Sequence, residues 1–299
     1  MLRATADRHS VIDLIALSDA AMHLEPLPTS VTRLAALVAK GNFDVGDVVE
    51  IVQYDQALTA AVLRAANSSW SGVRTEITTA KAAVVRLGSN QVLALALRGN
   101  VRGRMQPAIP AYDLAEGVLW RHSVAASLAA EALAIFARVR LPAETATAAL
   151  LHDIGKLVLA RFFDPLDVQA VHRAHETGAS QLRSEREVLG ADHAELGGLI
   201  VQAWGLPEVL VSGITFHHAP EESSTPIAYG VFVADVAAKR VVSDADDTGS
   251  ENLAPALSAL GLTTGVFDDV CNLVADRLGA LIDDDMKLDG NAGSADSAS

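Results

Sequence analysis

A histidine and an aspartate stand next to each other in an apolar stretch of the chain, as His152-Asp153 within residues 150–157. Neighbouring residues of a helix point about 100° apart, so the two side chains cannot share one face. Both can nevertheless reach a metal ion at the edge of the helix, and the carboxylate can bridge two ions. Taken alone, the dyad can equally be a buried, hydrogen-bonded pair that holds helices together.

Other histidines and one further aspartate also lie in apolar helical patterns: His122, His193, the pair His217-His218, and Asp235. Five imidazoles and two carboxylates form a mixed set of nitrogen and oxygen ligands. Such a set suits Zn, Fe, Mn or Ni better than Mg or Ca. It is large enough for two divalent transition-metal ions, which together can activate water against a phosphodiester.

Each of these residues also has a simpler interpretation when it is taken singly. His122 can be a hydrogen-bonded core residue, and His217-His218 can be an exposed helix end. A lone buried carboxylate is costly, so Asp235 can instead pair with Arg86 or Arg240. These alternatives remain open from the residues alone.

Asp153 and Lys156 are the candidate catalytic residues. Lys156 follows His152 by about one helical turn, and its ammonium group can steady a phosphate oxygen. A solvated surface lysine is the competing interpretation of Lys156.

The elements that must position these residues are all predicted to be helices. Apolar residues recur at helical spacing, and no stretch alternates with period two, so we expect an all-α, multi-helix bundle. The expected helices that carry the candidate residues cover about residues 114–137, 142–163, 180–204 with a break near Gly190, 207–218 and 226–240.

The chain divides into five expected segments. They are an N-terminal segment and helix (1–22), an N-terminal helical lobe (23–106), a metal-site lobe (107–242), a loop and helix (243–282) and a disordered acidic tail (283–299). The tail is rich in Asp, Gly, Ser and Ala and has little to bury. One continuous bundle competes with two lobes, because the apolar content does not fall near residue 107.

The composition excludes several classes of protein. The 299 residues are 50% hydrophobic and carry a formal net charge of -14 without a run of basic residues. This charge argues against a nucleic-acid partner, although a local basic pocket for a small phosphate remains open. No apolar stretch is long enough for a membrane span. The single cysteine, Cys271, forms no internal disulfide, so we expect a cytoplasmic protein.

The order His122, His152-Asp153, His193, His217-His218, Asp235 resembles the HD superfamily of metal-dependent phosphohydrolases, and residues 152–156 are similar to the motif of its HD-GYP branch. The first half, together with one segment of the second, is similar to the HDOD (HD-related output domain) family instead. The similar segments are Leu27-Pro28-Thr29, residues 51–59, 63–68 and 77–88, and Trp204-Gly205-Leu206-Pro207. The resemblance covers about residues 20–240.

This resemblance implies a helical, HD-domain-like fold and a role in bacterial signal transduction, with a signalling protein or a small phosphorylated ligand as partner. It implies that His122, His152, Asp153 and Asp235 hold one ion. It also implies that Asp153, His193, His217 and His218 hold a second ion, with Asp153 as the bridge. Many HDOD members have lost such ligands and are regarded as output or scaffold modules.

The chain departs from the HD-GYP pattern at two places. Residues 219–222 follow the paired histidines where a Gly-Tyr-Pro segment would stand, and Val118 occupies a position where trinuclear relatives carry a glutamate. Both departures argue against a third ion and against specificity for cyclic-di-GMP. Two hypotheses remain: an output module with a structural, vestigial or ligand-sensing metal site, or an active phosphohydrolase on a nucleotide or cyclic dinucleotide.

Overall fold

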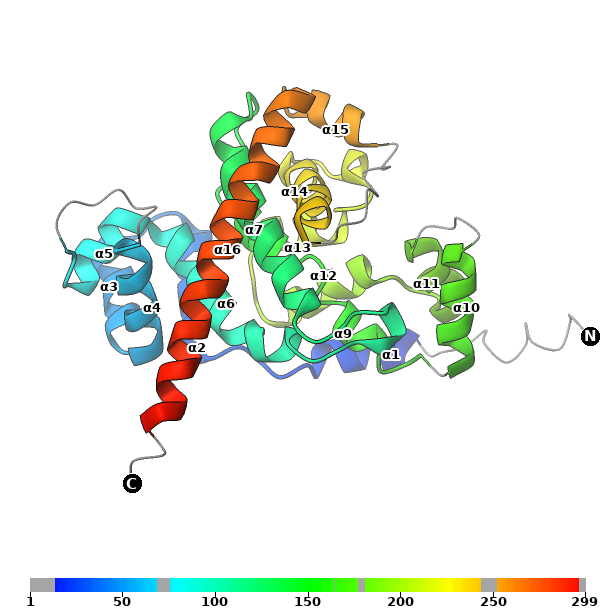
Figure 1. Cartoon of the computed structure of the whole chain (residues 1–299), viewed down its shortest axis with the longest axis horizontal. Coiled ribbons are helices and arrows are strands. Elements are labelled where there is room, and N and C mark those ends of the chain that lie inside the picture. The colour runs from blue at the N-terminus through cyan, green and yellow to red at the C-terminus, as the bar shows by residue number, and fades with distance from the viewer. Residues whose placement is uncertain (1–13, 69–75, 164, 177–180, 243–251, 296–299) are drawn as a thin grey trace, which may run out of the picture.

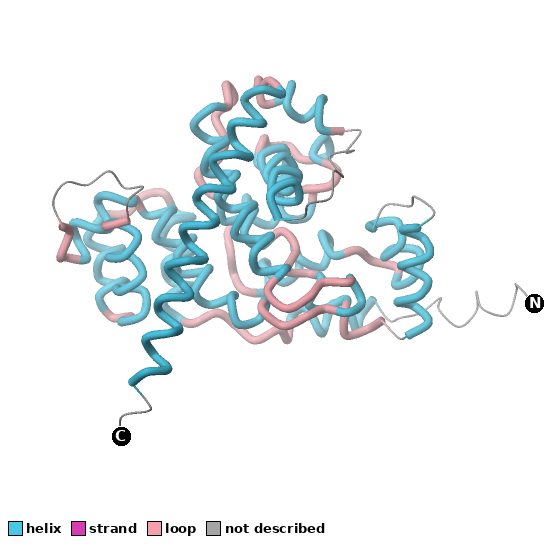
Figure 2. The backbone as a smooth tube through the Cα atoms, viewed as in Figure 1, coloured by secondary structure: helices cyan, strands magenta, loops and turns pink. Residues whose placement is uncertain are grey.

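The computed structural model describes residues 14–68, 76–163, 165–176, 181–242 and 252–295. Within these ranges the chain is built of helices without a strand, and an isolated antiparallel bridge joins Ile109 to Leu114. Figure 2 shows helices joined by short loops. The predicted all-α fold class is therefore confirmed.

The helices of the first half are α1 (Leu14–Met22), α2 (Thr29–Lys40), α3 (Val45–Gln53), α4 (Gln56–Ala66), α5 (Ala80–Leu87) and α6 (Ser89–Met105). Of these, α3, α4 and α5 lie at the left of Figure 1, α2 and α6 lead from there toward the centre, and α1 lies beside α9 (Lys156–Leu159) and α12 (His193–Ala203). Capping fixes their starts: Asp44 and Asp47 form a capping box at α3, and the Asp55 and Thr79 side chains cap α4 and α5.

The second half holds the remaining helices and two short 3-10 turns. They are η2 (Pro110–Tyr112), α7 (Val118–Phe136), α8 (Thr145–Leu151), α9 (Lys156–Leu159), α10 (Pro165–Glu176), α11 (Gln181–Leu189), α12 (His193–Ala203), α13 (Glu208–Thr215), η3 (Pro220–Glu222), α14 (Ile227–Val242), α15 (Leu253–Ala259) and α16 (Thr264–Ala295). Gly190, at a φ of +77°, separates α11 from α12, as the sequence indicates.

Helix α7 is the centre of this half. It packs against α8, α14 and α16, and α16 crosses in front of it in Figure 1. Most of its residues from Leu119 to Leu133 are buried, and many are alanines. A helix that is apolar on all sides must be covered on all sides. Small side chains let the neighbouring helices approach closely.

The dyad His152-Asp153 lies in a turn and not within a continuous helix. The expected helix over 142–163 is replaced by α8, a turn over residues 152–155, and the short α9. The amide of Ile154 donates to the carbonyl of Leu151, and that of Lys156 donates to Asp153, both across three residues. Local apolarity predicts helix here, but packing of this turn on α12 breaks it.

The last helix is longer than expected. A helix within residues 266–281 and a disordered tail over 283–299 were predicted, whereas α16 continues to Ala295. This corrects the prediction for residues 283–295. Once a helix is nucleated, each added residue needs no new nucleus, and no proline stops it here. The short α15 was not expected either.

The molecule is elongated, with α3, α4 and α5 at one end and α10 and α11 at the other (Figure 1). Helix α6 contacts α2, α4 and α5 as well as α7 and α8, so it connects the two halves. The division into lobes at residue 107 stays a prediction. None of the described helices combines the length and apolarity that crossing a membrane requires.

Candidate metal centre

The structure brings all seven predicted metal-site residues together where α7, α12 and α14 meet the ends of α8 and α13. His122 comes from α7, His152 and Asp153 from the turn after α8, His193 from the start of α12, His217 and His218 from the turn after α13, and Asp235 from the middle of α14. The side chains converge although they are far apart in the sequence. We call these seven residues the His/Asp cluster.

One half of the cluster consists of His122, His152, Asp153 and Asp235. The Nε2 atom of His122 lies 3.2 Å from Nε2 of His152, 3.1 Å from Oδ1 of Asp235 and 3.6 Å from Oδ2 of Asp153. The Nε2 atom of His152 lies 3.4 Å from Oδ2 of Asp153 and 3.5 Å from Oδ1 of Asp235. Four potential ligand atoms therefore surround one small space.

These separations match those of ligands around a single ion. Ligand atoms at about 2.1 Å from an ion lie roughly 3.0 Å apart in an octahedron and roughly 3.4 Å apart in a tetrahedron. The measured separations run from 3.1 to 3.6 Å. This half of the cluster can thus accept an ion without rearrangement of its side chains.

The other half consists of His193, His217 and His218, together with the second oxygen of Asp153. The Nε2 atom of His193 lies 3.2 Å from Oδ1 of Asp153 and 3.1 Å from Nε2 of His218. Ligand atoms of His193, His217 and His218 all lie within 4.8 Å of one another. The two oxygens of Asp153 thus face different halves of the cluster.

Three of the imidazoles have their tautomer fixed by the group behind them. Nδ1 of His152 lies 2.7 Å from the carbonyl oxygen of Ala149, and Nδ1 of His217 lies 2.6 Å from that of Ile214. A carbonyl oxygen only accepts, so each Nδ1 must carry the hydrogen. Nδ1 of His193 likewise donates to the carboxylate of Glu185. A ring held through Nδ1 in this way turns its Nε2 atom toward the cluster, as metal-binding histidines do.

Two buried atoms of the cluster have no hydrogen-bond partner among the described residues: Nε2 of His217 and Oδ1 of Asp235. His122 approaches Oδ1 of Asp235 without forming a hydrogen bond to it. Unpaired buried polar atoms are costly. An ion in each half of the cluster would satisfy these atoms, so the residues present fit a metal.

The protonation states of the cluster favour cation binding. Burial lowers the pKa values of His122, His217 and His218, which keeps these rings neutral. Burial alone would raise the pKa of Asp153, but the neighbouring His152 and Lys156 hold it well below its ordinary value. Neutral imidazoles and a charged carboxylate are the forms that bind metal.

His193 differs from the other histidines. Burial opposes its protonation, but the nearby Glu185 carboxylate outweighs this effect and raises the pKa of His193 to about 9. Glu185 at Nδ1 and Asp153 at Nε2 thus favour positive charge at this ring.

Lys156 is neither solvated nor free for a phosphate. It is 7% exposed, and its Nζ lies 2.7 Å from Oδ2 of Asp153 and 5.7 Å from the ring centre of Tyr112. In this arrangement it neutralises the buried carboxylate. Its predicted contact with a substrate phosphate stays a prediction.

Sequence reasoning missed two residues that hold the cluster. Lys239 donates to Oδ2 of Asp235 at 2.7 Å, so Asp235 pairs with neither Arg86 nor Arg240. The spacing of four residues on one helix could have indicated this pair. Glu185, fully buried, accepts from Nδ1 and from the backbone amide of His193. No local pattern distinguishes it from Glu187, the other glutamate of its helix.

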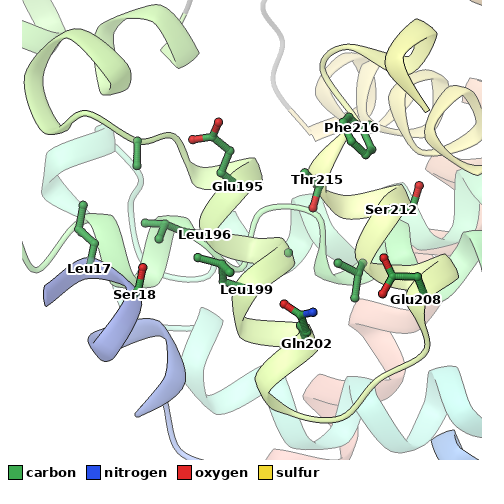
Figure 3. A pocket seen from close by; sticks show the side chains of 13 residues that line it. Leu17, Ser18, Glu195, Leu196, Leu199, Gln202, Glu208, Ser212, Thr215 and Phe216 are labelled. Atoms are coloured by element: carbon green, nitrogen blue, oxygen red, sulfur yellow. The ribbon is translucent and has the colours of Figure 1, made fainter. Parts of the chain in front are cut away.

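The outer side of α12 and α13 carries a separate groove of about 490 Å³, which α1 closes on one side (Figure 3). Its lining includes Leu17, Leu196, Leu199 and Phe216, and no residue of the His/Asp cluster. A second cavity of about 480 Å³ reaches His218. Access to the cluster from solvent therefore lies at its His218 edge and at the partly exposed His122.

Comparison with known proteins identifies what the chain resembles. The family model named HDOD domain matches residues 24–220. A curated but uncharacterized protein of Treponema pallidum is 25% identical over 201 residues, which are 66% of this chain and 38% of that protein. The chain thus spans well under half of that relative.

Solved structures show the same fold. A protein of Shewanella amazonensis, provisionally named a phosphohydrolase, is 27% identical with a TM-score of 0.65, and the match covers 89% of this chain and 97% of that one. An HDOD domain protein of unknown function from Geobacter sulfurreducens is 21% identical with a TM-score of 0.63, covering 91% and 96%. A provisional signal transduction protein of Marinobacter aquaeolei is 24% identical with a TM-score of 0.66, covering 86% and 60%.

Proposed function

The chain belongs to the HDOD domain family, and we propose that it is a bacterial signal-transduction output module whose His/Asp cluster holds two divalent transition-metal ions. His122, His152, Asp153 and Asp235 would hold one ion. Asp153, His193, His217 and His218 would hold the other.

The observation that carries this proposal is the position of Asp153 between the two halves of the cluster. Its Oδ2 faces His122 and His152, and its Oδ1 faces His193. A carboxylate with one oxygen toward each of two nitrogen-rich groups is the arrangement of a bridging ligand. A hydrogen-bonded core aspartate would need only one such group.

Burial of the cluster favours a regulatory role over turnover. His152, Asp153, His193, His217 and Asp235 are each at most 2% exposed. Lys156, the cation best placed for a phosphate, is already paired with Asp153. A buried metal site whose neighbouring lysine is already paired is better suited to holding a conformation or sensing an ion than to binding a substrate phosphate.

A phosphohydrolase remains the second candidate, because the cavity of about 480 Å³ reaches His218. Two bound ions would supply activated water and charge stabilisation for the hydrolysis of a phosphate ester. The chain's own residues would admit the substrate between α11 and α13. A nucleotide or cyclic dinucleotide is the substrate class to test.

Metal analysis of protein purified without chelators tests the proposal. We expect close to two transition-metal ions per chain in the wild type and a clear loss in His152→Ala. His23→Ala is the matched control, because His23 is an exposed histidine outside the cluster. A wild-type chain that binds no transition metal, with or without added Zn²⁺, would remove the proposal.

The two candidate functions separate in an activity assay. Manganese-dependent cleavage of bis(p-nitrophenyl) phosphate that disappears in His152→Ala would establish the phosphohydrolase. Metal-loaded protein that cleaves neither this ester nor cyclic dinucleotides supports the output module.

A further inference from the structure

Helices α10 and α11 form a pair at one end of the molecule (Figure 1). They contact each other more than either contacts any other described helix. The sequence of α11, residues 181–189, is mostly polar, and its buried residues are Ser184, Glu185 and Leu189. Apart from the apolar Val188 and Leu189, which pack on the core, the contacts of α11 with the body of the molecule are therefore mainly polar.

The polar contacts of α11 converge on the first turn of α12. The Glu185 carboxylate accepts from the backbone amide of His193 at 2.8 Å and from its Nδ1 at 2.8–2.9 Å. Arg186 reaches Asp192, the N-cap residue of α12, at 2.6 Å and Glu195 at 3.3 Å. Two consecutive residues of α11 thus fasten it beside the His/Asp cluster.

Glu185 differs from its neighbour Glu187 on the same helix. Glu185 is fully buried, whereas the Glu187 side chain is 57% exposed and pairs with Arg183. Burial alone would raise the pKa of Glu185, but the contacts to His193 lower it below the ordinary value. A buried carboxylate is tolerated only where it is paired, and the partner here is an imidazole of the cluster.

We propose that Glu185 is a positioning residue for His193 and that it couples metal occupancy of the His/Asp cluster to the attachment of the α10–α11 pair. The inference rests on the proposed metal site. It adds that α11 is the helix whose attachment changes when a metal ion binds.

The imidazole of His193 transmits the coupling. Its Nδ1 faces Glu185, and its Nε2 faces Asp153 and His218. A carboxylate behind a metal-binding histidine fixes the ring and makes it a stronger ligand. Compared with a neutral ring, an ion on Nε2 in turn makes the Nδ1 hydrogen a stronger donor to Glu185. Coupling free energies are reciprocal. If the attached α11 strengthens binding of the ion by some factor, the bound ion favours the attached position of α11 by the same factor.

The test compares Glu185→Gln with the wild type and with Glu187→Gln, the exposed control on the same helix. The glutamine keeps the volume of the side chain. Its NH₂ group, which donates, would face one of the two N–H groups of His193 that the carboxylate now accepts from. Zn²⁺ affinity is measured by competition with a chromogenic chelator. Hydrogen exchange of the α10 and α11 amides is followed with and without saturating Zn²⁺.

We expect Glu185→Gln to bind Zn²⁺ about 10- to 100-fold more weakly than the wild type, and Glu187→Gln to bind unchanged. In the wild type, Zn²⁺ should slow exchange of the α11 amides by up to the same factor. This slowing should be absent in Glu185→Gln.

Two results would overturn the coupling but not the proposed metal site. One is wild-type Zn²⁺ affinity in Glu185→Gln, and the other is hydrogen exchange of the wild-type α11 amides that does not change with Zn²⁺. No Zn²⁺ binding by the wild type would overturn the proposed function as well. If Glu185→Gln does not fold, the wild-type exchange experiment alone decides, because it compares one folded protein with and without the ion.

Discussion

The buried ion pair of Lys156 with Asp153 places an ammonium group where a metal would add two further positive charges. Lys156 Nζ lies 2.7 Å from the same oxygen, Oδ2, that faces His122 and His152. In the metal-free chain this lysine compensates the carboxylate. With ions bound, the compensation is largely redundant.

Lys156→Met should therefore destabilise the metal-free protein more than the metal-loaded one. Removal of one partner of a buried ion pair leaves an uncompensated charge, which costs about 3 kcal/mol. An ion at Asp153 restores the compensation, so Zn²⁺ should recover most of the loss. Chemical denaturation in EDTA and in Zn²⁺ measures both states.

Lys40→Met, a change at an exposed lysine at the end of α2, is the control and should be near neutral in both conditions. Equal destabilisation of Lys156→Met with and without Zn²⁺ would show that Lys156 acts through packing and not through its charge.

At the residue scale, the sequence identified the cluster because histidines and aspartates in apolar helical patterns need partners. His193 and Asp235 were found in this way, and the structure brings them to the dyad. Glu185 was not found, because a glutamate in a polar helix is typical of a solvated surface. Only tertiary contact makes it a buried partner of His193.

At the element scale, the turn over residues 152–155 depends on how closely it approaches α12. A Cβ atom on Gly155 would clash with the backbone oxygen of His193 and would lie 2.8 Å from the amide nitrogen of Gly197. Both contacts are with backbone, which cannot move aside without moving α12. Gly155 thus sets the spacing between the dyad and His193.

Gly155→Ala should displace α12 from the turn, lower the thermal midpoint by several degrees and reduce Zn²⁺ uptake. Overpacking of this kind costs about 1–3 kcal/mol. Gly99→Ala in α6 is the matched control, because a Cβ there meets nothing within 4 Å. The control should be neutral or stabilising, since alanine favours helix over glycine. Calorimetry and metal analysis of both variants check this; unchanged midpoint and uptake in Gly155→Ala would contradict it.

The ends of helices were predictable where nearby residues determine them, and less so where contacts with distant residues do. The break at Gly190 and the start of α3 at Asp44 follow from glycine and capping chemistry, and both are present. The break after Leu151 was missed, because the apolar run continues through it. A contact with α12, distant in the sequence, interrupts that helix.

At the scale of the whole molecule, the all-α fold and the HDOD family were predicted from the sequence and are confirmed. Helical spacing of apolar residues extends over most of the chain, so the fold class was readable. The extent of α16 was not, because composition indicates that residues 283–295 bury little but does not decide whether their backbone is helical.

With the proposed ions bound, the stability of the whole fold should depend on metal. The ligands of the His/Asp cluster come from α7, α12, α14 and the turns after α8 and α13, and these elements meet only in the folded chain. An ion that binds the folded and not the unfolded chain stabilises it by about 2.7 kcal/mol at 100 times its Kd. We expect Zn²⁺ to raise the thermal midpoint by several degrees and EDTA to reverse this.

Asp153→Asn is the informative variant for this whole-molecule effect, because both halves of the cluster share Asp153. The amide cannot place a charged oxygen toward both halves, so the Zn²⁺-dependent rise in the midpoint should largely vanish. His23→Ala should respond to Zn²⁺ like the wild type. An undiminished rise in Asp153→Asn would mean that Zn²⁺ stabilises the chain from another site, and that Asp153 does not bridge the two halves of the cluster.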